Sequence, residues 1–201
     1  PSKWVACCAL RWRDCLICNW LENMRIILED PYERDIFHAG EREAHRRFGV
    51  AAEAREMKAT VNSQLSAGNA GFMACQPFFF LSVREAGGAI HTQMLACAAT
   101  VQGTYPVVAF GDARTFYFLL GEHAGAVLLS LAQGDGCKAG TVFVDFARRA
   151  RLRVNGRLCV AGDDALPGFQ CPAGYRLMQM SVEQAYANCQ SRIVRLKAAK
   201  A

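Results

Sequence analysis

The sequence predicts a mainly β protein of the α+β class, in which short antiparallel strands form a barrel and helices flank it. Between residues 78 and 180, short apolar runs recur, and turns that contain Gly and Asp separate them, a pattern that is typical of a barrel. The stretch 35–66 is instead rich in Ala, Glu, Arg and Met, which are residues that favour helices. Helices are therefore expected before the strands.

The composition is that of a globular domain. The chain has 201 residues, of which 52% are hydrophobic and 20% are charged, and its formal net charge of +5 permits an anionic ligand without requiring nucleic acid. No apolar run reaches the roughly 18 residues of a membrane span. The ten cysteines lack the spacing of a disulfide framework, as in reducing compartments. We therefore expect a cytoplasmic protein with neither nucleic acid nor membrane as a partner.

Residues 1–23 differ from the rest of the chain, since they hold all three tryptophans and four of the ten cysteines. Cys15 and Cys18 form a lone CxxC pair, whereas a structural zinc site needs four ligands. Met24 is a candidate natural start, which would make residues 1–23 an atypical extension that is not native. A single domain is accordingly expected over residues 24–201. A mature N-terminus upstream of Met24, found in protein made from its own gene, would contradict this expectation.

Turn signals divide the chain into a helical part and a series of strands. Two helices are expected at Gly40–Phe48 and Val50–Leu65, and the Gly- and Asn-containing Ser66–Gly71 is expected to be a loop. For Ala126–Leu131, periodicity does not decide between helix and strand. Strands are expected at Phe78–Arg84, Ala89–Cys97, Val107–Phe110, Thr115–Leu120 and Gly174–Met180.

The most informative stretch is Thr141–Val160, which the polar turn Ala147–Ala150 divides into the two strands of a hairpin. Polar and apolar residues alternate in the second strand, so that one of its faces carries Arg151, Arg153 and Asn155. Two guanidiniums offer planar forks of donors that suit a phosphate. The alternative reading is a solvated strand face without a ligand.

A helix is expected at the end of the chain. Ser181 and Gln184 have the spacing of a capping box. Apolar residues then recur near the helical period, at Val182, Tyr186, Cys189, Ile193 and Leu196.

The sequence lacks the motifs of side-chain catalysis. It contains no GxSxG elbow, P-loop or HExxH, its four histidines are scattered, and no base is evident beside Cys189. We therefore expect no catalytic side chain and no metal site. An enzyme without its own acid, base or nucleophile usually leaves the chemistry to a cofactor.

Three segments resemble the pyridoxamine 5'-phosphate oxidase-like, FMN-binding split-barrel family. Pro77–Leu95 resembles the first hairpin of the family, and Gly140–Arg157 resembles its most diagnostic hairpin, which ends in an R-x-R-V-N-G run. Val182–Ile193 is similar to the C-terminal Q-x-x-x-N-C-P-x-x-I motif of one bacterial branch. Gln93 stands where the oxidase itself has an Arg that grips the flavin phosphate, so the resemblance is to this branch and not to the true oxidase.

This resemblance implies a six-stranded antiparallel split barrel with flanking helices, which works as a homodimer and holds FMN in a groove between the subunits. Arg151 and Arg153 would contact the FMN phosphate or isoalloxazine, and Arg149 could reach the same anion. The site would further be lined by Asn155, Gln93, Ser82, Gln184 and Asn188. The implied function is an FMN-dependent oxidoreductase of unknown substrate that receives its electrons from a separate donor.

Two other functions are weighed against this one. The same barrel can hold a flavin, a deazaflavin or a haem without turning over a substrate. Nucleic-acid binding through Arg148–Arg157 is disfavoured, because Leu and Val interleave with the cations and no exposed aromatic is available for base stacking.

Overall fold

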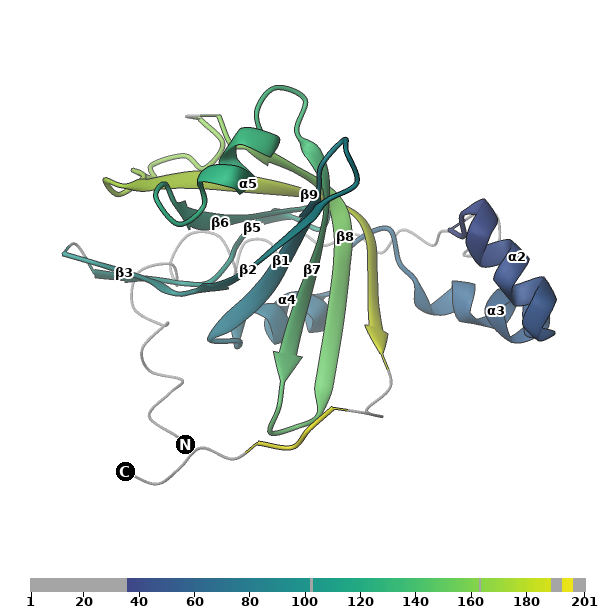
Figure 1. The fold of residues 1–201 in the computed structure, drawn as a ribbon. Coiled ribbons are helices and arrows are strands. Elements are labelled where there is room, and N and C mark those ends of the chain that lie inside the picture. Colours follow the sequence, from purple (N-terminus) through teal and green to yellow (C-terminus); the bar gives the residue numbers. More distant parts are fainter. Residues whose placement is uncertain (1–35, 102, 163, 189–192, 197–201) are drawn as a thin grey trace.

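The computed structural model describes residues 36–101, 103–162, 164–188 and 193–196. The expected extension at residues 1–23 lies outside these ranges, as does Cys189. In the described part, an antiparallel sheet dominates and few helices accompany it (Figure 1).

Seven strands form the main sheet, in the order β2-β1-β7-β8-β9-β6-β5. The bounds of these strands are β1 (Phe78–Arg84), β2 (Ile90–Ala96), β5 (Ala109–Asp112), β6 (Thr115–Gly121), β7 (Cys137–Asp145), β8 (Ala150–Val160) and β9 (Tyr175–Asn188). A separate pair joins β3 (Ala98–Thr100) to β4 (Gly103–Tyr105). The prediction of an antiparallel β-rich fold is confirmed.

The structure differs from the expected six-stranded split barrel, because the main sheet has seven strands and is not closed into a barrel. Strands β2 and β5 are its two edges, and no ladder joins them within the described residues. The segment between these edges instead pairs with itself as β3 and β4, with Ala98 opposite Tyr105. Its backbone groups are thus satisfied without bridging the two edges.

Phenylalanine rings pack together on the buried face of the sheet. Phe79 stacks on Phe143 with ring centroids 4.8 Å apart, and the edge of Phe118 meets Phe79 at 5.2 Å. Phe116 approaches Phe143 at 6.3 Å, and all four rings are buried. Aromatic side chains bury large apolar areas, so this cluster joins β1, β6 and β7 into one core.

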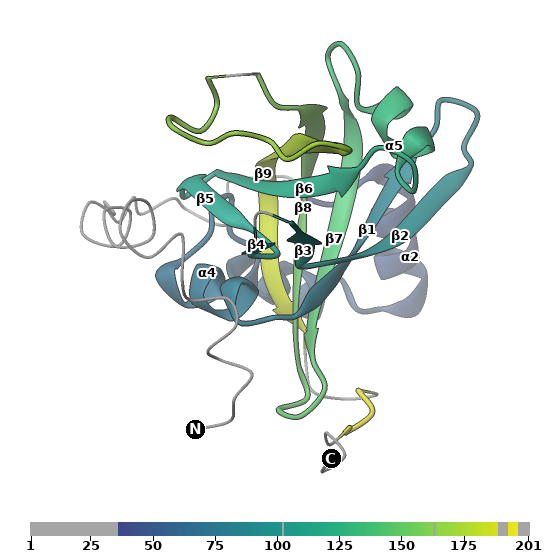
Figure 2. The same cartoon turned by 90° about the vertical axis from the view of Figure 1, so that its left-hand side faces the viewer.

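The helices lie at the margins of the sheet. They are α2 (Ala39–Phe48), α3 (Ala51–Met57), the 3₁₀ helix η1 (Lys58–Thr60), α4 (Ala67–Ala74) and α5 (Ala126–Leu131). Figures 1 and 2 place α4 and α5 at opposite ends of the sheet, whereas α2 and α3 stand apart to one side. No helix of the described residues is long and apolar enough to cross a membrane.

Two helix predictions near the N-terminal side are wrong. The helix expected to reach Leu65 ends at Thr60, because Asn62 forms an antiparallel bridge with Ala185 through hydrogen bonds of 2.9 and 2.7 Å. The expected loop at Ser66–Gly71 is helical from Ala67 onward, as the start of α4. The Ser66 hydroxyl caps this helix at the Asn69 amide, and burial of Met73 on its inner side outweighs the low helix propensity of its glycines.

The expected C-terminal helix is also wrong where the structure describes it, because β9 continues through residue 188 as a strand. Met178, Met180 and Val182 are buried at alternate positions, which gives this segment the period of a strand. A bulge then shifts the register between Asn155 and Gly156 of the neighbouring strand β8. The capping-box spacing therefore lies inside a strand, where pairing with β8 satisfies the backbone groups that a helix would otherwise pair.

Candidate functional site

Strand β8 has one face in the core and one outside it, as the alternation of its sequence predicts. Leu152, Val154 and Leu158 are buried, whereas Arg151 and Arg153 are half-buried on the opposite face. Residues paired across antiparallel strands point to the same side of a sheet. The cross-strand pairs therefore show that this second face extends over β2, β1, β7, β8 and β9. We call it the outward face.

Small and polar residues form one straight row across the outward face. The registers align Thr92, Ser82, Gly140, Asn155 and Gln184 on successive strands, and we call these five residues the polar row. The hydroxyl oxygens of Ser82 and Thr92 share a hydrogen bond of 2.8 Å. Nδ2 of Asn155 donates to Oε1 of Gln184 at 3.1 Å. Three of the predicted site residues thus come together here from three strands.

The two arginines of β8 occupy the next rows of the same face. Arg153 lies between Val142 on β7 and Tyr186 on β9, and Arg151 lies opposite Val144. Within the described ranges, neither guanidinium has an ion-pair or hydrogen-bond partner, and Nε of Arg151 is buried. An unsatisfied buried donor costs about 1–3 kcal/mol. A ligand oxygen at this position would satisfy it, and an anionic oxygen would do so most strongly.

Apolar side chains surround the arginines and the polar row. Ile90 is 68% exposed and Met94 is 56% exposed. The rings of Phe78 and Phe80 lie 5.7 Å apart in an edge-to-face arrangement. A contiguous apolar surface on a folded domain indicates a ligand or protein interaction site. The outward face therefore combines exposed apolar side chains, a row of polar residues and two arginines that have no partner in the described ranges.

The structure places Arg149 and Asn188 at the end of this face that lies near the hairpin turn. Arg149 has a positive φ of 55° in the turn between β7 and β8, and its Nε donates to the carbonyl oxygen of Ile193 at 3.0 Å. Asn188 is paired with Arg151 through the register of β8 and β9. Arg149 is thus held against residues 193–196, and the roles expected of both residues stay predictions.

Gln93 is separated from the other predicted site residues. It is paired with Leu81 and so shares the inner face of the sheet with that buried residue. Its Oε1 is buried and has no hydrogen-bond partner among the described residues. The neighbouring Thr92 lies on the outward face instead. The proposed contact of Gln93 with the cofactor would therefore have to come from the inner side of β2.

Sequence reasoning missed three members of this face, namely Thr92, Gly140 and Tyr186. All three lie in the segments that resemble the flavin-binding family. Only the cross-strand register shows that Thr92 and Gly140 complete the polar row and that Tyr186 flanks Arg153. The turn of a hairpin fixes which residues of its two strands face each other. With the turn between β7 and β8 known, Gly140 would have been identified opposite Asn155.

Three of the described cysteines have raised pKa values, and one of the described histidines is bonded to a carboxylate. Burial raises the pKa of the Cys137, Cys159 and Cys171 thiols above the ordinary value, so they stay protonated and weakly nucleophilic at neutral pH. His91 lies on the inner face and bonds to Glu85 at 2.8 Å. In the described ranges, no group of three or more His, Cys, Asp or Glu is placed to hold a metal ion.

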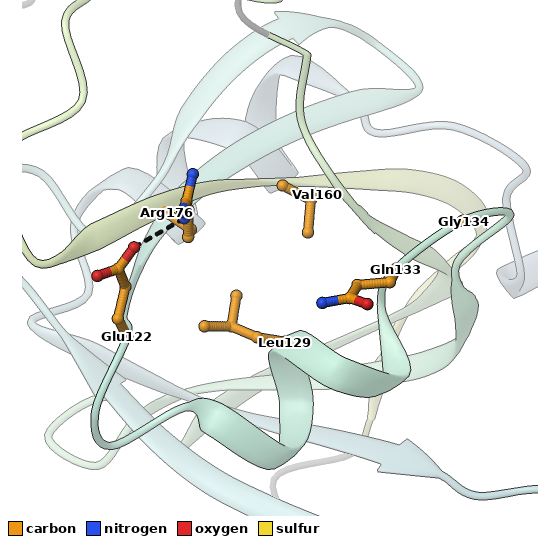
Figure 3. Close-up of a pocket in the computed structure, with 6 residues that line it drawn as sticks. All are labelled: Glu122, Leu129, Gln133, Gly134, Val160 and Arg176. Atoms are coloured by element: carbon orange, nitrogen blue, oxygen red, sulfur yellow. Dashed lines mark ion pairs between the residues drawn. The ribbon is translucent and has the colours of Figure 1, made fainter.

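A second candidate site is a cavity of about 430 Å³ between α5 and the ends of β8 and β9. Leu129 and Val160 form its apolar part, and Gln133 points into it from the end of α5 (Figure 3). Nε of Arg176 is bonded to Oε1 of Glu122 at 2.8 Å on its rim. This carboxylate offsets the positive charge of Arg176, and none of the predicted site residues lines the cavity. The outward face is therefore the stronger candidate.

Comparisons with known proteins give low similarity throughout. No family model matches the chain, and no curated protein matches it. Among solved structures, a candidate pyridoxamine 5'-phosphate oxidase from Lactobacillus delbrueckii is 15% identical, with 62% of this chain and 95% of that chain covered and a TM-score of 0.47. HupZ from Group A Streptococcus is 16% identical, with 63% and 95% covered and a TM-score of 0.45.

A pyridoxamine 5'-phosphate oxidase-related, FMN-binding protein from Nostoc punctiforme is 12% identical, with 54% of this chain and 73% of that chain covered and a TM-score of 0.37. The structure neighbours thus include pyridoxamine 5'-phosphate oxidase-like and FMN-binding proteins, the family that the sequence motifs resemble. At TM-scores below 0.5 this likeness assigns no ligand and no residue role to the chain.

Proposed function

We propose that the protein binds FMN on the outward face and acts as a flavin-dependent oxidoreductase. The observation that carries this proposal is the pair of arginines on β8, which have no protein partner within the described residues and lie beside an apolar surface and the polar row. FMN joins a phosphate to a flat, largely apolar ring with a polar edge, and the outward face offers a complement to each part.

The residues present fit such a cofactor. The orphaned Nε of Arg151 suits a phosphate oxygen. Arg153, one row nearer to Asn155, would place positive charge beside the pyrimidine ring of the flavin. Gly140 carries no side chain, and this leaves room for the amide group of Asn155, since a Cβ atom on Gly140 would lie 3.0 Å from Oδ1 of Asn155.

Bound FMN would supply hydride transfer at its N5 atom. The chain itself contributes binding, orientation and charge through Arg151, Arg153 and the polar row. Its substrate and electron donor would bind separately. Ser82 and Asn155 would position the ring, and the apolar surface around Phe80 and Met94 would exclude water from it.

Haem is the less favoured cofactor for this face. A histidine is the usual proximal ligand of haem iron, and the described outward-facing residues of β2, β1, β7, β8 and β9 include none. The visible spectrum of the purified protein separates these cases, because bound flavin absorbs near about 370 and 450 nm as a property of the cofactor itself, whereas haem gives a Soret band. A colourless protein that takes up neither FMN nor deazaflavin would overturn the proposal.

We expect Arg153→Ala to weaken FMN binding by about 1.5–3 kcal/mol, the range for a hydrogen bond to a charged group. This corresponds to roughly a tenfold to 150-fold rise in Kd, and fluorescence titration of the apoprotein measures it. Arg157→Ala is the matched control on the same strand, because Arg157 is occupied with the carbonyl oxygens of Asp135 and Gly136 at 3.0 and 3.3 Å. Equal loss of affinity in both variants would remove Arg153 from the site.

A second copy of the chain is the proposed cover of the outward face, so that the cofactor would lie between two subunits. The exposure of Ile90 and Met94 gives this face the apolar character of an oligomer interface. We expect sedimentation analysis to give a dimer. We expect Met94→Arg to shift the monomer–dimer equilibrium toward monomer, because the substitution would bury an unpaired charge in the interface. Phe48→Arg, at a side chain that is 79% exposed on α2, is the control. A wild-type monomer at micromolar concentration would contradict the dimer.

A further inference from the structure

The cavity between α5 and the ends of β8 and β9 is bounded by segments that backbone hydrogen bonds hold in place. The amide of Glu122, which follows β6, donates to the carbonyl oxygen of Gly174 at 2.9 Å. On the other side, the amide of Val160 donates to the carbonyl oxygen of Ala132, just after α5, at 3.2 Å. Both walls are thus fastened by the fold itself, so a ligand would meet a preformed site and lose little free energy in ordering it.

A glycine allows α5 to begin close to the sheet. Gly125 precedes the helix, and a Cβ atom there would lie 2.5 Å from Cγ of Leu120 and 2.9 Å from the carbonyl oxygen of Gly121. The helix therefore starts directly against the end of β6, with Leu128 buried beneath it. Leu129, the next residue, is only partly buried and lines the cavity.

The lining of the cavity is apolar in the middle and polar on two sides. Leu129 and Val160 face each other across it (Figure 3). The ion pair of Glu122 and Arg176 lies on one side of them, and the side chain of Gln133 lies on the other. A volume of about 430 Å³ is in the range of small-molecule pockets, which combine apolar walls with a few polar groups. Because Gln133 bounds the apolar part, a short aliphatic group suits it better than a long acyl chain.

The ion pair on the rim keeps capacity for a ligand. Its shortest contact joins Nε of Arg176 to Oε1 of Glu122 at 2.8 Å, and the two side chains are 61% and 45% exposed. A guanidinium has five N–H donors and a carboxylate has two oxygens, so this contact leaves donors on Arg176 and acceptor capacity on Glu122. A purely anionic ligand would be repelled by Glu122 and a purely cationic one by Arg176. The rim therefore favours a ligand that carries both charges.

We propose that this cavity binds a small zwitterionic amino acid with an aliphatic side chain. Since the two charges of the rim are in contact, the two charged groups of the ligand must also be adjacent, as they are on one α-carbon. The carboxylate of the ligand would accept hydrogen bonds from Arg176, and its ammonium group would donate to Glu122. Its aliphatic chain would lie between Leu129 and Val160. This site is separate from the outward face and does not depend on the proposed flavin function.

L-Leucine and two of its analogues test the proposal on the wild-type protein. Isocaproate lacks the ammonium group of leucine and isoamylamine lacks its carboxylate, whereas both keep the aliphatic chain. In an NMR titration, we expect leucine to shift the amide signals of Leu129, Gln133 and Val160. We expect it to bind about threefold to fivefold more tightly than either analogue, because each analogue loses one half-exposed charge contact. Isocaproate or isoamylamine binding as tightly as leucine would overturn the zwitterion, and unchanged signals with leucine would overturn the site.

Substitution of the rim carboxylate tests where the amino acid binds. Glu122→Gln should weaken leucine binding by about threefold to fivefold and bring the ratio of leucine to isocaproate affinity toward one, because the ammonium group loses its charged acceptor. Glu183→Gln is the matched control, since Glu183 forms a similarly exposed ion pair with Lys138 at 2.7 Å and does not line the cavity. It should keep the wild-type affinity for leucine. Equal losses in the two variants would overturn the placement of the amino acid in this cavity.

Discussion

Phe143→Ala is expected to lower the free energy of unfolding by about 3–5 kcal/mol, as large-to-small substitutions of buried aromatic residues do. Phe143 has no exposed surface, and its ring stacks on Phe79 at 4.8 Å and meets Phe116 at 6.3 Å. Alanine would leave a cavity among rigid rings that cannot collapse into it. Urea unfolding followed by circular dichroism measures the loss.

The matched control for this substitution is Phe48→Ala. Phe48 is 79% exposed on α2, so its removal should change the free energy of unfolding by less than about 0.5 kcal/mol. A loss of less than about 1 kcal/mol for Phe143→Ala would show that the aromatic cluster is not the core that joins β1, β6 and β7.

Gly156→Ala is expected to cost about 3 kcal/mol or more, at the upper end of the range for overpacking. A Cβ atom at this position would collide with the carbonyl oxygen of Ser181 and lie 3.2 Å from the amide nitrogen of Glu183. Both atoms belong to the backbone of β9 at the bulge, and backbone cannot yield as a flexible side chain can. Urea unfolding again gives the measurement.

Gly71→Ala is the control for this second substitution. Gly71 lies in α4, and a Cβ atom there would meet nothing within 4 Å, so alanine should stabilise the protein by roughly 0.5–1 kcal/mol. The bulge beside Gly156 also sets the register that brings Gln184 next to Asn155. Gly156→Ala should therefore weaken FMN binding as well, and a variant that keeps both wild-type stability and wild-type affinity would contradict the role given to this glycine.

Much of the strand content could be read from the sequence, because alternation and turn residues are local signals. The expected strand Phe78–Arg84 matches β1, and the hairpin at Thr141–Val160 is present as the longer strands β7 and β8. The prediction of a helix after Ser181 is wrong because of tertiary structure. Its capping pattern is local, but pairing with β8 is a long-range interaction that no local pattern reports.

The members of the candidate site were harder to predict than the strands that carry them. Six of the eight predicted site residues lie on the outward face or in the turn beside it, and the three on β8 follow from the alternation of that strand. Strand β2 is different, since Ile90 and Met94 on one side and Leu95 on the other are all apolar. A shift of one residue reverses the face of every side chain in a strand, so the sequence could not decide that Thr92, and not Gln93, faces outward.

The polar row has a consequence for how the protein would acquire its cofactor. Its members come from strands that are neighbours in space, and β1 lies beside β7 although β2 to β6 separate the two along the chain. Pairing between such distant segments raises the contact order, which slows folding. The ring-binding surface would then exist only in the finished sheet. A cofactor would load after folding, and it would stabilise the protein by mass action on the native state alone.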